Sequence, residues 1–150
     1  MQAIHVQNPR ALLVPEIEAL IRRATTAISF AAPGGFDSIA TDMYKFVTMD
    51  GLFMVMGVED GKHVGLVLGG FPTLNIFPYP TIFLFYNEGS PKMVKLLAQK
   101  TLDIMLERGY TKAWAVNSSG RPDAVWERLF RLQGVTELVP MGTVYELRVK

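Results

Sequence analysis

The sequence predicts one α/β or α+β domain in which helices cover both faces of a single sheet. Three stretches predict it: an uncharged strand leading into an amphipathic helix at residues 81–108, an acidic turn between apolar runs at residues 52–68, and an alternating segment at residues 143–149. The 150 residues suffice for one core, and no repeat or linker divides them. We therefore expect a single domain over residues 1–150.

Residues 81–108 combine a strand with a helix. Residues 81–86 are aromatic, aliphatic or β-branched, as in a strand that is covered on both faces. Ser90 can cap the helix with its side chain, Pro91 suits the first helical position, and Gly109 ends the helix. The helix is expected to bury Val94, Leu97, Ala98, Thr101, Ile104 and Met105. Because helix N-terminal amides attract anions, the preceding turn is either an anion site or an ordinary connection.

The remaining elements follow from apolar periodicity, prolines and turn residues. We expect strands at residues 3–6, 52–58, 63–68, 111–116, 136–139 and 143–149. Helices are expected to start at Pro15, at Asp37 or Ser38, and at Pro122. An acidic turn containing Asp-Gly at residues 59–62 joins two strands as a hairpin. Residues 69–80 are expected to form a loop over the sheet, and Arg22 and Arg23 are expected to face water.

The composition argues against several classes of function. A net charge of +1 gives no field that would draw nucleic acid or an anionic membrane. The chain has no cysteine and only two histidines, His5 and His63, so we expect no disulfide and no metal site. The N-terminus lacks an apolar signal segment, and charged residues interrupt residues 52–67, the longest mostly apolar region. We therefore expect a soluble cytoplasmic protein.

The order of elements, together with the strand and helix at residues 81–108, resembles the GNAT superfamily of acetyl-CoA-dependent N-acetyltransferases over nearly the whole chain. The resemblance implies a mixed, mostly antiparallel, twisted sheet of about six or seven strands, with four helices on both faces. In that family the fourth and fifth strands splay apart to admit the pantetheine, and amides of the following helix hold the pyrophosphate. Residues 83–87 and 111–117 would be those strands, with acetyl-CoA as co-substrate.

The resemblance also implies where the site residues lie. The coenzyme would contact Phe85, Asn87, Gly89, Ser90, Lys92 and Asn117. Tyr86 and His63 are the candidate catalytic residues, since either could take a proton from an attacking amine. The alternatives are that Tyr86 is a half-buried structural tyrosine and that His63 is a surface histidine. Glu59 and Asp60, in the turn before His63, are similar candidates with the same alternative of a surface residue.

Four residues depart from the family's pattern. The phosphate turn of the family reads roughly Arg/Gln-x-x-Gly-x-Gly/Ala, where this chain has Glu88, Pro91 and Met93 at the three named positions. A carboxylate there is expected to repel a diphosphate, proline has no N–H to donate, and a methionine side chain takes up space. Phe130 stands where a tyrosine often protonates the leaving thiolate. Coenzyme binding is expected to be weakened rather than excluded.

Two functions are left open by the sequence. The first is an N-acetyltransferase in which a primary amine attacks the thioester of acetyl-CoA directly, with an unidentified acceptor. The second is a fold that has lost this chemistry and serves as a binding or structural protein, for example in a phage or mobile element. Neither reading calls for nucleic acid or a membrane, and both leave a homodimer or another protein partner open.

Overall fold

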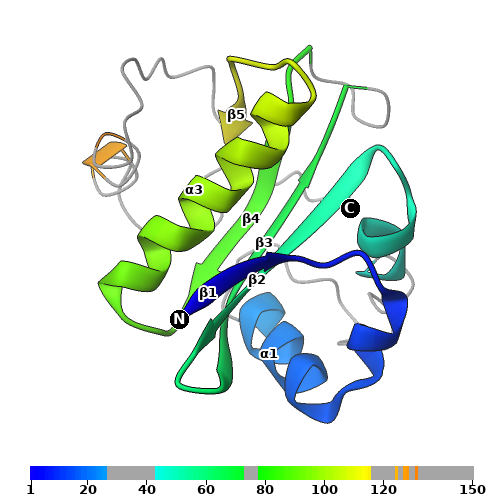
Figure 1. The fold of residues 1–150 in the computed structure, drawn as a ribbon, viewed down its shortest axis with the longest axis vertical. Coiled ribbons are helices and arrows are strands. Elements are labelled where there is room, and N and C mark those ends of the chain that lie inside the picture. The colour runs from blue at the N-terminus through cyan, green and yellow to red at the C-terminus, as the bar shows by residue number, and fades with distance from the viewer. Residues whose placement is uncertain (27–42, 73–77, 116–123, 125–126, 129–130, 132–150) are drawn as a thin grey trace, which may run out of the picture.

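The computed structural model describes residues 1–26, 43–72, 78–115, 124, 127–128 and 131. Among them a five-stranded sheet has the order β1-β2-β3-β4-β5 (Figure 1). The strands are β1 (Gln2–His5), β2 (Leu52–Glu59), β3 (Lys62–Gly70), β4 (Thr81–Asn87) and β5 (Trp114–Ala115). Neighbouring strands are antiparallel except β4 and β5, which run parallel.

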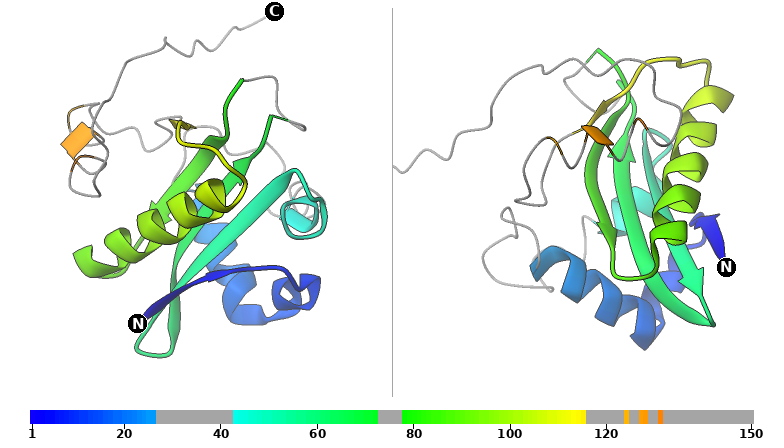
Figure 2. Two further views of the ribbon diagram at one scale, coloured as in Figure 1. Left: turned by 45° about the horizontal axis from the view of Figure 1, so that its top comes forward. Right: turned by 90° about the vertical axis from the view of Figure 1, so that its left-hand side faces the viewer.

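Helices lie on both faces of this sheet. A short 3-10 helix, η1 (Pro9–Leu13), precedes α1 (Pro15–Thr26), and α3 (Pro91–Glu107) connects β4 to β5. The two views in Figure 2 place α1 and α3 on opposite sides of the sheet. Residues 43–48 are also helical and lead toward β2. The described part of the chain is thus a mixed α+β arrangement in three layers.

Two apolar cores fill the space between these layers. The core on the α1 side contains Ile17, Ile21, Ala24, Met54, Met56, Leu66, Leu68 and Leu84. The core on the α3 side contains Phe53, Val55, Val67, Phe71, Ile82, Met93, Leu97, Ile104 and Met105. Successive residues of β2 alternate between the two cores, because side chains along a strand point to opposite faces. This burial on both faces explains why the sequences of the central strands are nearly continuous runs of apolar residues.

Two glycines let α3 approach the sheet closely. Gly57 of β2 and Gly65 of β3 are directly paired across the two strands. A Cβ at Gly65 would lie 2.5 Å from Leu97 Cδ1, and a Cβ at Gly57 would clash with the Met93 side chain. Glycine at both positions therefore leaves room for the buried side chains of the first half of α3.

The β2–β3 hairpin turns through two residues. Asp60 has φ 51° and Gly61 has φ 74°, so both adopt the left-handed conformation that a type I′ turn requires. The pairing shifts between Gly57 and Val58, which is typical of a β-bulge. The turn and the shift together set where Glu59 and His63 stand at this end of the sheet.

Most of the expected elements in the described residues are confirmed. The hairpin, α1 and the strand–helix unit of β4 and α3 form as expected, and Gly109, at φ 84°, follows the end of α3. Four details differ. β5 was expected over residues 111–116, but its described part is Trp114–Ala115, and residues 111–113 do not belong to it. Gly69 and Gly70 belong to β3 rather than to a loop, and Ser90 stands at the N-cap without a side-chain capping bond to any described residue. Met93 is fully buried, and Val94 only half-buried.

Several expectations fall outside the described residues. The start of the second helix, most of the fourth helix and both final strands cannot be compared, nor can Asn117 and Phe130. The described residues of the fourth helix, Ala124, Glu127, Arg128 and Arg131, are helical. The sheet of about six or seven strands with four helices is therefore confirmed only as five strands with α1, α3 and the helical residues 43–48.

We predict that Leu97→Ala lowers the free energy of unfolding by about 2–5 kcal/mol, because truncating a fully buried leucine leaves a cavity between α3 and the sheet. Chemical denaturation measures this loss. Lys95→Ala, at an exposed position of the same helix, is the control and should change stability by no more than about 0.5 kcal/mol. A loss of similar size for the lysine variant would show that the buried face of α3 is assigned wrongly.

A second prediction concerns the contact between Gly65 and Leu97. Gly65→Ala should destabilise the wild-type protein, because the new methyl group meets Leu97 Cδ1. In a Leu97→Ala background the same change should cost less, since the clashing atoms are gone. A double-mutant cycle should therefore give a coupling energy of about 0.5–3 kcal/mol. Strictly additive losses would argue against the close approach.

Candidate functional site

The turn between β4 and α3, residues 87–91, has its backbone donors satisfied by the protein itself. The Glu88 N–H donates to Val64 O at 2.9 Å. The Gly89 N–H donates to Asn87 Oδ1 at 3.0 Å, and the Ser90 N–H to Glu59 Oε2 at 2.8 Å. Pro91 has no N–H. As the structure stands, an external anion would have to displace one of these acceptors to reach the N–H groups of residues 88–90.

Asn87 fixes the shape of this turn. Besides accepting from the Gly89 N–H, it donates through Nδ2 to Gly89 O at 3.3 Å and to Ser90 O at 3.2 Å. These bonds span the turn without help from another element. Asn87, which the sequence suggested as a coenzyme contact, therefore has a structural role in this conformation.

The carboxylate of Glu59 lies at the N-terminus of α3. Its oxygen accepts the Ser90 N–H, and that bond is the main reason why the pKa of Glu59 falls below its usual range. The positive charges of the N-terminal amine and Lys92 act in the same direction. A carboxylate at this place is what the partial positive charge of a helix N-terminus favours. The turn thus already holds an anionic group.

Two neighbouring features complete this anion site. A Cβ added to Gly89 would lie 2.5 Å from Glu59 Oε2 and 2.7 Å from Val64 Cγ2, so only glycine leaves room for the carboxylate. Ser90 Oγ is buried and faces the Glu59 carboxylate, where it also helps to lower the pKa of Glu59, although its geometry falls short of a hydrogen bond. Sequence reasoning treated Glu59 as an acidic residue of the hairpin and as a candidate similar to His63, but not as a partner of α3. No local signal linked it to Ser90, which is 31 positions away.

A second polar group joins the end of β4 to α1. Tyr86 Oη donates to Glu88 Oε2 at 2.7 Å, and Arg23 donates to the same carboxylate through Nε at 3.0 Å and Nη2 at 2.6 Å. Arg23 holds the pKa of Glu88 below its usual range. Burial, followed by the hydrogen bond to Glu88, raises the pKa of Tyr86 to about 12. Tyr86 is therefore protonated at neutral pH and is a poor base.

This group adds detail to two expectations. Arg22 and Arg23 are both exposed, as expected, and each also pairs with an acidic side chain: Arg22 with Glu18 on the same helix, and Arg23 with Glu88. The Glu88 carboxylate, expected to repel a diphosphate, has its charge matched by the bidentate Arg23. Met93 also leaves the turn unobstructed, since its side chain is buried against the sheet.

His63 belongs to a third polar group, at the start of β3. Its backbone N–H donates to Glu16 Oε1 at 2.8 Å, and its Nδ1 lies 3.1 Å from the same oxygen. The backbone bond is the main cause that lowers the pKa of Glu16. Glu16 and Arg23 are two turns apart in α1, so this helix ties the hairpin and the end of β4 together. Both candidate catalytic residues are thus bonded to acidic side chains.

The other suggested coenzyme contacts lie along β4 and α3. Phe85 is half-buried against the core on the α3 side, and Lys92 is exposed in the first turn of α3. The parallel pairing of β4 with β5 is described at Thr81–Trp114 and Ile82–Ala115, at the start of both strands. The expected splay would lie beyond these pairs, where the described part of β5 has ended.

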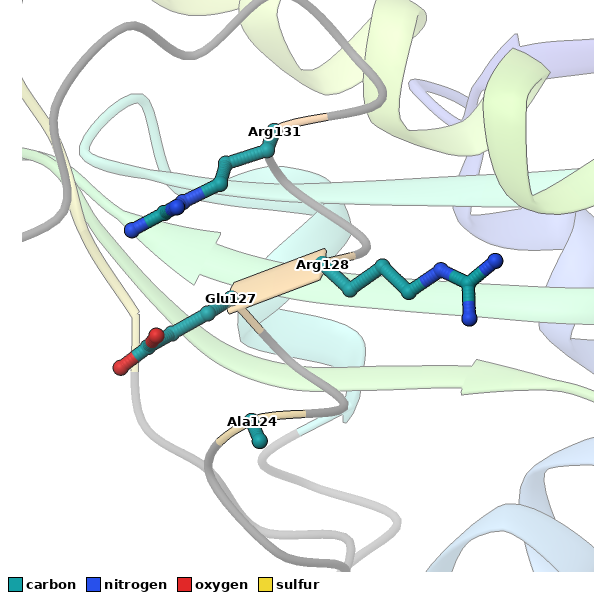
Figure 3. A pocket seen from close by; sticks show the side chains of 4 residues that line it. All are labelled: Ala124, Glu127, Arg128 and Arg131. Carbon is teal, nitrogen blue, oxygen red and sulfur yellow. The ribbon is translucent and has the colours of Figure 1, made fainter.

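Two of the cavities among the described residues lie away from this turn. One, of about 340 Å³, is lined by Ala124, Glu127, Arg128 and Arg131, and Figure 3 shows Arg128 pointing away from Glu127 and Arg131. Another, of about 450 Å³, lies among η1, α1 and Tyr44 and is mainly apolar. Neither is lined by a residue suggested as part of the site. A cavity alone does not identify the ligand of either one.

Two further searches cover only the part of the chain that the structure describes. In it, no group of three or more histidine, cysteine, aspartate or glutamate side chains could hold a metal ion. None of the helices in those same ranges combines the length and apolar character that a membrane crossing requires.

This chain is similar to known proteins in its structure rather than in its sequence. No protein-family model matches the chain, and no curated protein matches it in sequence. Solved structures match it over almost its full length. An aminoglycoside acetyltransferase from an uncultured soil metagenomic sample, in complex with sisomicin, has a TM-score of 0.66 and 13% identity, with 98% of this chain and 96% of that chain covered.

Two more solved structures are similar to the same extent. AAC(6')-Iy, in complex with the bisubstrate analog CoA-S-monomethyl-acetylneamine, has a TM-score of 0.69 and 14% identity, covering 99% of this chain and 100% of that one. A ribosomal-protein-alanine N-acetyltransferase from Brucella melitensis biovar Abortus 2308 has a TM-score of 0.65 and 17% identity, covering 99% and 97%. The chain therefore has the fold of the GNAT N-acetyltransferases, in a divergent form.

Proposed function

We propose that the protein is an N-acetyltransferase that transfers the acetyl group of acetyl-CoA to a primary amine. The observation that carries this proposal is the anion at the N-terminus of α3, where the Glu59 carboxylate accepts the Ser90 N–H at 2.8 Å. The resemblance to the family implies a pyrophosphate at this place. A solved structure of the same fold in complex with a CoA-containing bisubstrate analog supports the proposal.

The residues of the turn offer the hydrogen-bond donors, the space and the positive charge that a diphosphate needs. Once Glu59 has left, Ser90 offers both its N–H and the buried hydroxyl that now faces the Glu59 carboxylate. Gly89 leaves the space that a phosphate oxygen needs, and Lys92 adds positive charge. Arg23 neutralises the nearby Glu88. Gly89, Ser90 and Lys92 would thus hold the coenzyme, which supplies the acetyl group as a thioester.

Proton transfer from the amine favours His63 over Tyr86. Tyr86 keeps its proton at neutral pH and already donates it to Glu88. The pKa values of Glu16, Glu59 and Glu88 are all lowered, which makes these carboxylates weak bases. A proton on His63 Nδ1, 3.1 Å from Glu16 Oε1, would leave Nε2 free to accept one. We assign His63 the role of base, directly or through water.

For the acceptor of the acetyl group, we propose only its chemical class, an amine. The similar structures are acetyltransferases of aminoglycosides and of a ribosomal-protein alanine, which differ greatly in size and polarity. What these acceptors share is an amine. An amine that attacks the thioester must be neutral, so the reaction is expected to speed up as the pH rises toward the pKa of the acceptor.

A second candidate function is a binding or structural protein that kept the fold and lost the chemistry. It is favoured by the same turn, because its N–H groups, and the Tyr86 hydroxyl beside it, are all satisfied within the protein. In this reading Glu59 permanently takes the place of the coenzyme phosphate. Coenzyme binding separates the two candidates.

We predict that acetyl-CoA at millimolar concentration raises the thermal unfolding temperature of the wild-type protein by a small but measurable amount. A ligand that binds only the folded state at a hundredfold excess over its Kd would stabilise it by about 2.7 kcal/mol, and the bound Glu59 should reduce this. S-acetyl-pantetheine, which lacks the diphosphate, is the control and should give no shift. No shift with acetyl-CoA in the wild type or in Glu59→Gln would favour the binding protein.

We also predict that Glu88→Gln lowers the pKa of Tyr86 from about 12 toward its ordinary value, because the charged acceptor of its hydroxyl is removed. NMR titration of ring-labelled tyrosine, with Tyr86→Phe to assign the signal, measures this. The unfolded chain loses this proton near pH 10 and the folded protein near pH 12, so stability should fall between these values. An unchanged pKa in Glu88→Gln would leave burial as the sole cause.

A further inference from the structure

We infer that Glu59 is a built-in competitor of the co-substrate: its carboxylate occupies the anion site at the N-terminus of α3, and the diphosphate of the coenzyme binds only when Glu59 leaves Ser90. This inference rests on the proposed function. The β2–β3 hairpin, which carries Glu59, would thereby control whether the coenzyme binds. The contact itself, from Glu59 Oε2 to the Ser90 N–H, is 2.8 Å long.

The site holds its shape without Glu59. The Asn87 side chain fixes the turn through its bonds to Gly89 N, Gly89 O and Ser90 O. The Glu88 N–H is held by Val64 O. Since none of these bonds involves Glu59, its departure would free the Ser90 N–H and leave the turn in place. The site is therefore preformed, and its occupant can be exchanged.

The position of Glu59 allows its side chain to leave without disturbing the apolar cores. It is the last residue of β2, half-buried, and is followed by the exposed Asp60. The buried part of β2 ends at Gly57, so moving the Glu59 side chain does not open either apolar core. The bond to Ser90 is local to the hairpin end, unlike the bidentate pair of Glu88 with Arg23. Of these two acidic residues, Glu59 is the one placed to move.

Glu59 and a phosphate cannot share this place. An oxygen within hydrogen-bonding distance of the Ser90 N–H would lie where Glu59 Oε2 now lies, and two anions in contact repel strongly. The apparent Kd of the coenzyme is then its intrinsic value divided by the fraction of molecules in which Glu59 has left. Removing the charge of Glu59 should raise that fraction. The wild-type protein should bind acetyl-CoA weakly for this reason.

The test compares Glu59→Gln with Asp60→Asn. Glu59→Gln keeps the length of the side chain and removes its charge. Asp60→Asn removes the same charge from the next residue, which is exposed at the tip of the hairpin. Asparagine tolerates the left-handed conformation of Asp60, at φ 51°, so the turn should be kept. Thermal unfolding without ligand confirms that each variant is folded.

Isothermal titration with acetyl-CoA, and separately with inorganic pyrophosphate, gives the affinities. Glu59→Gln should bind both probes about tenfold more tightly than the wild type, because the competing charge is gone. Asp60→Asn should stay within about threefold of the wild type, as expected for the loss of one exposed charge. The Ser90 amide signal of ¹⁵N-labelled Glu59→Gln should shift when pyrophosphate binds.

The outcomes separate this inference from the proposed function. Equal or weaker binding of both probes by Glu59→Gln, relative to the wild type, overturns the inference, and so does an equal gain in Asp60→Asn. If both proteins transfer acetyl groups to amines and bind acetyl-CoA with the same affinity, the proposed function stands and the competition by Glu59 is rejected. Tighter pyrophosphate binding in Glu59→Gln, with no transfer to any amine, would keep the competition and reject the transferase.

Discussion

The close approach of α3 to the sheet is the constraint on which the rest of the structure depends. Gly57 and Gly65 face each other on adjacent strands, and Met93 and Leu97 fill the space that their missing side chains leave. With the helix held so near, its N-terminus lies beside the end of the β2–β3 hairpin. The contact between Glu59 and Ser90 is therefore a product of apolar packing one turn further along the helix.

Three acidic residues around this end of the sheet are each matched by a donor. Glu16 accepts from His63, Glu59 from Ser90, and Glu88 from Arg23 and Tyr86. Charged partners and backbone N–H groups stabilise the ionised forms, so all three carboxylates have lowered pKa values. These three carboxylates therefore hold their charge well and accept protons poorly.

Much of the fold could be predicted because its signals are local. The Asp-Gly turn requires positive φ at both residues, and Pro91 and Gly109 mark the two ends of α3. The site was harder to predict because its contacts are not local. The bond of Glu59 to Ser90 spans 31 positions and that of Arg23 to Glu88 spans 65, and neither leaves a pattern in the sequence. The turn was identified from sequence, but its occupant was not.

The place of β1 has a consequence for how the chain is assembled. Its partner β2 begins at Leu52, so pairing Gln2 with Val58 closes a loop of more than forty residues, whereas β2, β3 and β4 follow one another along the chain. Loop closure costs entropy that a two-residue hairpin avoids. In the described sheet β1 is paired on one side only. Among the strands of the described sheet, β1, which carries the N-terminus, is thus the one whose pairing closes the longest loop and bears the largest entropy cost.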